Sequence, residues 1–261
     1  FGHEGEGPGE FKWLLHLRVK GDHLEIPTIG KLARFSLDGQ FLDEVKVPVR
    51  TFKNMIARIG DNYLVRDYQF DDTERITIIR LYGKDFKLIK EIGTRKEKRG
   101  RNRINLWPEV YSAFVGREKI YVVESGMEST VMVYNGAGER QEKIRLPLKP
   151  VKITSALKEV LLKPIREDPE MKAGWDEYEK RLHIPDYAPG LDFFTVTEDK
   201  WIVRTYNIRG NSVEFIIFNM TGKEMRRVFL PYTGRMTSVL FCFHQGRDFY
   251  VNENVDKECG E

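Results

Sequence analysis

The chain has 261 residues, of which 32% are charged and 41% hydrophobic, and its formal net charge is +3. This length is sufficient to bury a sizeable core within one domain. The sequence has no apolar run near the ~20 residues of a membrane-spanning helix, and so small a net charge does not by itself indicate a nucleic-acid partner. We therefore expect a globular chain with no membrane span and no nucleic-acid partner.

Short apolar strands separated by tight-turn residues recur along the chain. Their second strands begin at residues 23, 63, 120, 201 and 249, and turn residues such as Gly60-Asp61-Asn62 precede them. Glycine, asparagine and aspartate tolerate the positive backbone angles of tight β-turns. The first and last steps from one of these starts to the next are close to the length of one four-stranded propeller blade, about 40 to 45 residues. The pattern predicts an all-β, six-bladed β-propeller with about five blades visible.

A second repeat combines a glycine with a proline nine residues later and an aromatic residue four positions before the glycine. The three copies are Phe35, Gly39 and Pro48; Tyr134, Gly138 and Pro147; and Phe218, Gly222 and Pro231. Self-similarity of this kind is the signature of an array of supersecondary units. It supports the propeller prediction, because stacking such units buries faces that each sheet alone would expose.

The second step is longer than one blade, and it contains a basic segment. We predict a polar loop near residues 94–106, within which residues 95–103 include six basic residues and one acidic residue. Such a run can pair with phosphates or with an acidic partner. Aromatic residues that would stack on bases are not interleaved with it, and a solvated loop between blades is the interpretation we favour.

The third step contains residues 150–189, where apolar residues follow a helical period. One predicted stripe comprises Met171, Trp175, Tyr178 and Leu182. Spacings of four, three and four residues are typical of one face of an amphipathic helix, and prolines at positions 164 and 169 are expected to separate two helical segments. We predict a helical insertion with helices within residues 154–183, the alternative being a degenerate blade. Either the propeller's own face or another chain must cover Trp175 and Tyr178, and in the second case the insertion is an interaction site.

The glycine-rich start of the chain resembles a known family. Residues 2–11, GHEGEGPGEF, are similar to the linker between blades of NHL-repeat and related six-bladed β-propellers, and the later Phe35-Ser-Leu-Asp-Gly39 fits the same group. Residues 184–189, IPDYAP, resemble the end of the helical insertion in bacterial exported propellers of this NHL-repeat/TolB-like superfamily. The resemblance implies a single propeller domain over residues 1–261, with an N-terminal blade and C-terminal strands supplied from outside this sequence.

Two arginines occupy matching places in two repeated units. Arg66 and Arg204 each stand two residues before a tyrosine, Tyr68 or Tyr206, and alternate residues of a strand share one face. One interpretation is a pair of guanidinium donors for a small anionic ligand in the channel or for a partner's carboxylates. The other, which we favour, packs the arginines between blades and pairs them with aspartate or glutamate.

The two cysteines, Cys242 and Cys259, lie in the last predicted blade. Two thiols alone cannot form a tetrahedral structural zinc site. A disulfide between them would suit an oxidising compartment, whereas a buried free thiol is the other interpretation of Cys242.

The sequence contains no nucleophile elbow, phosphate-binding loop or dinucleotide-binding motif. We therefore predict no catalytic residues, no cofactor and no metal in a non-catalytic binding or assembly module. It would mediate protein–protein interaction in the periplasm or at the cell surface, with Arg66, Tyr68, Arg204, Tyr206, Trp175 and Tyr178 as candidate contacts. The alternative, implied by the resemblance, is a lactonase- or lyase-type enzyme with a divalent metal in the central channel. Its candidate ligands would be Glu124, Asn207, Asn252 and Glu253.

Overall fold

The computed structural model describes most of the chain. The described residues are 3–11, 17–28, 30–47, 56–70, 73–98, 104–105, 110–116, 118–197, 199–231, 239–244 and 247–252. The chain divides into two compact units. The first contains residues 1–101, 111–122 and 132–142, and the second contains residues 102–110, 123–131 and 143–261.

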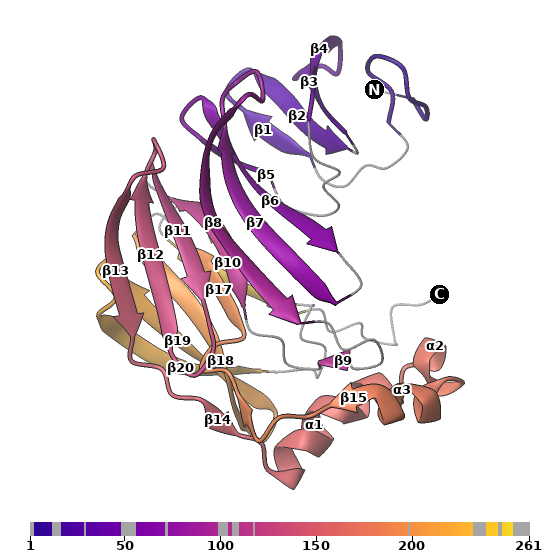
Figure 1. Cartoon of the computed structure of the whole chain (residues 1–261), viewed down its shortest axis with the longest axis vertical. Helices are drawn as coiled ribbons and strands as arrows, with labels where there is room; N and C mark the ends of the chain where they lie inside the picture. Colours follow the sequence, from indigo (N-terminus) through magenta and orange to yellow (C-terminus); the bar gives the residue numbers. More distant parts are fainter. Residues whose placement is uncertain are drawn as a thin grey trace. The chain divides into compact units, whose positions relative to one another are not determined.

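Four successive four-stranded sheets dominate the structure, and within each sheet strands that follow one another in sequence are neighbours (Figure 1). The first contains β1 (Arg18–Lys20), β2 (His23–Thr28), β3 (Lys31–Ser36) and β4 (Phe41–Lys46). The second contains β5 (Ile56–Ile59), β6 (Asn62–Phe70), β7 (Glu74–Tyr82) and β8 (Leu88–Lys98). The third contains β10 (Tyr111–Gly116), β11 (Lys119–Glu124), β12 (Ser129–Asn135) and β13 (Arg140–Leu146). The fourth contains β17 (Phe193–Val196), β18 (Lys200–Arg209), β19 (Ser212–Asn219) and β20 (Glu224–Pro231).

A final hairpin pairs β21 (Val239–His244) with β22 (Arg247–Asn252). This succession of antiparallel meanders is the order of strands in propeller blades, and it confirms the predicted all-β, propeller-like fold. The predicted starts of the five second strands lie within two residues of the observed starts of β2, β6, β11, β18 and β22. Closure into a six-bladed ring and membership of the NHL-repeat/TolB-like superfamily stay predictions.

The repeated glycine occupies the same turn in three sheets. Its φ is 88° at Gly39, 76° at Gly138 and 78° at Gly222, a left-handed conformation that glycine adopts without steric penalty. In each copy the glycine amide donates to the carbonyl three residues earlier, at Ser36, Asn135 or Asn219. That earlier residue in turn donates its amide to the carbonyl that follows the glycine. The repeat seen in the sequence is therefore a repeat of hydrogen-bonded turns.

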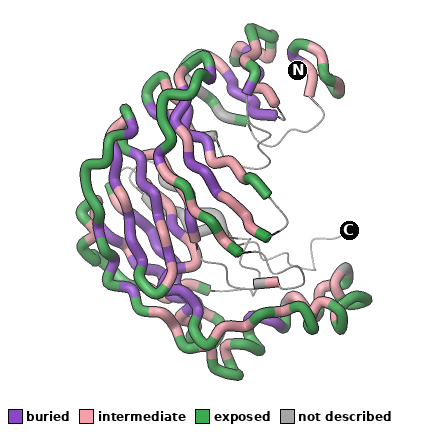
Figure 2. The backbone as a smooth tube through the Cα atoms, in the orientation of Figure 1, coloured by how far each residue is buried: buried purple, intermediate pink, exposed green. Residues whose placement is uncertain are grey.

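The middle strands of the sheets are buried along continuous stretches, whereas the fourth strands are mostly exposed (Figure 2). Residues 201–206 of β18 are all buried. Continuous burial requires cover on both faces of a sheet. In the first unit, Ile79 and Leu81 of the second sheet pack with Ile120 and Val122 of the third, so successive sheets share their cores.

Three helices lie within the predicted helical segment. They are α1 (Ser155–Arg166), α2 (Pro169–Lys172) and α3 (Trp175–Arg181). Thr154 begins α1 as its N-cap, since its hydroxyl accepts the amide of Leu157 at 3.2 Å. The expected break at Pro164 is wrong, because α1 continues to Arg166. Burial of Leu161 and Leu162 outweighs the one amide hydrogen bond that proline cannot donate.

The predicted stripe from Met171 to Leu182 does not lie on one helix. Gly174 separates α2 from α3, consistent with the poor helix propensity of glycine. Leu182 begins β15 (Leu182–His183), which pairs in parallel with β9 (Ile104–Asn105). No residue of α3 is buried. Across the described residues, no helix is long and apolar enough to cross a membrane.

The basic segment is partly a strand rather than a loop. β8 extends to Lys98, and its residues Arg95 and Glu97 pair with Thr77 and Arg75 of β7. The predicted loop is therefore wrong for residues 94–98, because the long β6–β7 hairpin offers backbone partners to the end of β8. Residues 99–103 lie outside the described residues.

Candidate functional site

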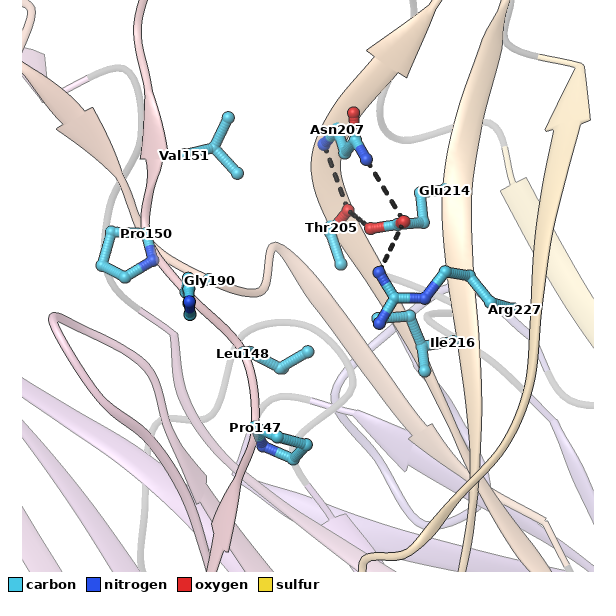
Figure 3. A pocket seen from close by; sticks show the side chains of 11 residues that line it. Pro147, Leu148, Pro150, Val151, Gly190, Thr205, Asn207, Glu214, Ile216 and Arg227 are labelled. Atoms are coloured by element: carbon cyan, nitrogen blue, oxygen red, sulfur yellow. Dashed lines mark hydrogen bonds and ion pairs between the residues drawn. The ribbon is translucent and has the colours of Figure 1, made fainter.

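A pocket of about 370 Å³ opens in the second unit between an extended segment and the fourth sheet (Figure 3). Its volume falls within the range of about 300–1,000 Å³ typical of ligand pockets. The extended side supplies residues 147–151 and Gly190. The sheet side supplies Thr205 and Asn207 from β18, Glu214 and Ile216 from β19, and Arg227 from β20.

A bulge in β18 positions two of the polar side chains. Arg204 pairs with Phe215 and Ile208 pairs with Val213, so residues 205–207 lie opposite Glu214 alone. Bulges locally re-aim side chains and are common beside functional sites. In a regular ladder, positions 205 and 207 would oppose two different residues of β19. Here both side chains reach the same carboxylate.

The carboxylate of Glu214 is the centre of the polar wall. It accepts hydrogen bonds from Thr205 Oγ1 at 2.8 Å, from Asn207 Nδ2 at 3.2 Å and from Arg227 Nη1 at 2.9 Å. The side chain of Glu214 is only 5% exposed, and a buried charge must be paired and hydrogen-bonded to be tolerated. Both of its oxygens are engaged by the protein, so Glu214 shapes the pocket rather than offering a free base.

Arg227 is held from two sides. Its Nε and Nη2 donate to the two carboxylate oxygens of Glu224 at 3.1 and 2.8 Å, in addition to the bond from Nη1 to Glu214. These hydrogen bonds, chiefly those to Glu224, raise the pKa of Arg227 further above its usual value. The same bonds lower the pKa of Glu224. Of the charged residues that line the pocket, Lys149 and Arg227 are cationic and Glu214 is anionic. Glu224 supplies a second carboxylate to Arg227 from outside the lining.

The opposite wall is apolar. It is formed by Pro147, Leu148, Pro150 and Val151, on the segment that lies across from the sheet in Figure 3. The end of this segment is fixed because β14 (Val151–Lys152) pairs with β16 (Tyr187–Ala188). Proline has no amide hydrogen, so this wall presents few donors. The pocket can hold an apolar group against one wall and direct polar groups toward the other.

Arg204 and Tyr206 are close to the bulge in sequence but do not line the pocket. Arg204 donates through Nε to Asp192 Oδ2 at 2.5 Å, and its side chain is 4% exposed. Burial raises the pKa of Asp192, and the charge of Arg204 opposes that shift. Tyr206 is buried with Leu161 and Ala188. Both residues therefore contribute to packing within the second unit.

Arg66 and Tyr68 lie in the first unit. Arg66 Nη1 donates to Ser112 Oγ at 2.5 Å, and its guanidinium carbon lies 5.6 Å from the centre of the Tyr68 ring. Arg66 and Arg204 thus occupy matching sequence positions but have different partners. On α3, the rings of Trp175 and Tyr178 are half-buried, with centroids 5.8 Å apart.

Sequence reasoning named Asn207 only as a metal ligand, and in the structure its amide nitrogen donates to Glu214. It missed Thr205, Glu214 and Arg227. One signal was available: Glu214 is the only charged residue in the apolar strand SVEFIIFN, and a charge in a buried strand requires a partner.

Within the part of the chain that the structure describes, no three His, Cys, Asp or Glu side chains are grouped as metal ligands. Glu253 and Cys259 lie outside the described residues, as do the side chains of Asn252 and Cys242. The two interpretations of Cys242, a disulfide or a free thiol, and this part of the alternative metal site are therefore not tested by the structure.

The sequence matches no protein-family model and no curated protein. Among solved structures, BamB from Moraxella catarrhalis is similar at 11% identity and a TM-score of 0.32, over 89% of this chain and 73% of that one. The N-terminal domain of Nup159 gives 11% identity and a TM-score of 0.31, over 83% and 47%. A prolyl endopeptidase gives 13% and 0.34, over 87% and 35%. The chain thus spans less than half of two of these three, and likenesses this low carry no argument about function.

Proposed function

We propose that the chain is a non-catalytic propeller module that mediates protein–protein interaction, and that a segment of a partner protein occupies the pocket beside the fourth sheet. The observation that carries this proposal is the pairing of an apolar, proline-containing wall with a polar wall whose charges are already balanced. A peptide segment presents the complementary groups, because it combines apolar side chains with neutral backbone amides.

The polar wall retains hydrogen-bonding capacity for such a segment. A guanidinium has five N–H donors, and Arg227 uses three of them on Glu214 and Glu224. Asn207 donates through Nδ2, and its carbonyl oxygen can accept a backbone amide. Because Glu214 and Glu224 hold Arg227 in place, binding need not immobilise that long side chain, which lowers the entropic penalty of association.

The proposed location is the periplasm or the cell surface, as part of the NHL-repeat/TolB-like group of exported propellers. The glycine-rich linker at residues 2–11 and the segment at 184–189 support this placement through their resemblance to that group. Fractionation of the source cells with an antibody against the chain tests it, and recovery with the cytoplasmic fraction would contradict it.

The function is tested by selecting linear peptides from a display library on the purified chain. Selected peptides are expected to bind with a Kd in the micromolar range, about −8 kcal/mol. Lys149→Trp places an indole at the pocket wall from an exposed position, and it should weaken binding by about tenfold or more, equivalent to about 1.4 kcal/mol.

The matched control is Lys143→Trp, which makes the same substitution at an exposed position of β13 outside the pocket. Binding by Lys143→Trp should equal that of the unmodified chain. If no peptide is enriched, or if Lys149→Trp and Lys143→Trp bind equally, the proposal fails.

A further inference from the structure

The second sheet continues beyond the core that it shares with its neighbour. Leu64 and Ile79 lie in that core, and the same face of β6 and β7 then carries Arg66, Tyr68 and Arg75 toward the far end of the hairpin. β6 and β7 have nine residues each and β8 has eleven, whereas β2 and β3 have six. The additional length therefore presents a cationic and aromatic face.

Arg66 is partly buried and has no carboxylate partner among the described residues. Among the described residues, its guanidinium donates to the Ser112 hydroxyl and forms no ion pair. Burial lowers the pKa of Arg66, and the positive charge of Arg75 lowers it further. A buried cation is normally paired with an anion, because desolvation is otherwise unfavourable.

Arg75 and Tyr68 lie close to Arg66 on this face of the sheet. Arg75 pairs with Phe70, two residues beyond Tyr68, and Arg66 lies two residues before Tyr68. The guanidinium carbon of Arg75 lies 5.7 Å from the centre of the Tyr68 ring, and that of Arg66 lies 5.6 Å from it. The ring is therefore flanked by cations. Arg75 itself forms an ion pair with Glu97.

We propose that Arg66, Arg75 and Tyr68 form a carboxylate-binding site that an acidic segment of a partner protein occupies. The inference does not depend on the pocket, since these residues lie in the first unit. Arginine suits this role because its planar donors match a carboxylate in a two-point hydrogen bond. A nucleic acid is disfavoured, since bases need an open aromatic face for stacking and guanidinium groups flank the Tyr68 ring.

The site is tested with a fluorescently labelled hexaglutamate peptide at low ionic strength, where screening is weak. Arg66→Gln should weaken binding by about tenfold or more, as expected for loss of a charge-assisted hydrogen bond. Arg66→Lys should retain part of the affinity, because it keeps the charge and loses the planar fork. The control is Arg226→Gln, which makes the same change in net charge at an exposed position of β20 and should leave binding unchanged.

Thermal unfolding separates this role from a structural one. If the role of Arg66 is to bind an anion, Arg66→Gln should melt at the same temperature as the unmodified chain or higher, because it removes a partly buried charge that has no ion-pair partner among the described residues. A lower melting temperature would indicate a structural role and overturn the inference. Arg75→Gln, at a partly exposed side chain, provides a second variant that should also weaken peptide binding.

Competition identifies the ligand chemistry. Inorganic phosphate should displace the peptide only at far higher concentration than unlabelled hexaglutamate does, since a single small anion cannot use several contacts. Equal displacement by phosphate, tighter binding of a single-stranded oligonucleotide, or unchanged binding by Arg66→Gln would each overturn the assignment to an acidic protein segment.

Discussion

Replacing Glu214 with alanine tests whether the carboxylate holds the polar wall of the pocket together. The substitution removes the acceptor of three hydrogen bonds, from Thr205, Asn207 and Arg227. The hydroxyl and the amide then lose their partner beside the pocket, and Arg227 keeps only Glu224.

The expected loss follows from the geometry. Hydrogen bonds to a charged group contribute about 1.5–3 kcal/mol each when buried, but the adjoining pocket admits water to the freed donors and Arg227 is 44% exposed. Discounting for solvation, we expect Glu214→Ala to lower the free energy of unfolding by about 2–3 kcal/mol. Glu214→Gln, which keeps an acceptor oxygen toward Asn207 and Arg227, should lose about half as much.

The measurement is chemical or thermal unfolding, in which about 2–3 kcal/mol corresponds to a fall in Tm of about 5–10 °C for a chain of this size. Glu224→Ala is the matched control, because it removes a carboxylate from the same arginine at a more exposed position and should cost about 1 kcal/mol or less. Equal losses for Glu214→Ala and Glu224→Ala would refute the idea that Glu214 is the centre of the network.

Three further outcomes are expected. Hydrogen bonds from Arg227 lower the pKa of Glu224 below its ordinary 4.5, so their contribution to folding stability is complete above that value and is lost as the pH falls through the lowered pKa. In an acid titration, the stability of Glu224→Gln should therefore decline less steeply than that of the unmodified chain. Identical curves would contradict this. Gly222→Ala should lower Tm more than Gly210→Ala, since both positions have positive φ but only at Gly222 does an added Cβ meet a neighbouring side chain. Equal shifts would count against this close contact. Leu161→Ala should lower the free energy of unfolding by about 2–4 kcal/mol, because Leu161 anchors α1 to the fourth sheet, and a loss below about 1 kcal/mol would show that the helix is not anchored there.

The sheets could be predicted from the sequence because their signals are local. A turn glycine with positive φ, such as Gly39 or Gly222, fixes a hairpin within a few residues, and repetition of that turn reveals the array. The break between α2 and α3 was missed because apolar periodicity over Met171–Leu182 continues across Gly174. Spacing records which residues share a face and does not record whether the backbone between them remains helical.

The pocket could not be predicted because it depends on contacts between strands. Nothing near Asn207 in the sequence marks the bulge that brings it and Thr205 to one carboxylate. The partners of Arg66 and Arg204 also could not be predicted from local sequence. Their surrounding sequences are nearly identical, yet Arg204 meets Asp192 whereas Arg66 meets a hydroxyl and a ring, because the elements packed against each strand differ.

The central claim, that a partner segment binds in the pocket, is tested most directly by nuclear magnetic resonance. A selected peptide is titrated into the isotopically labelled chain while backbone amide signals are followed. The account predicts that the largest shifts occur at Gly190, Thr205, Asn207 and Ile216, on the two walls of the pocket. Saturable shifts confined to other residues, with these four amides unchanged, would contradict it.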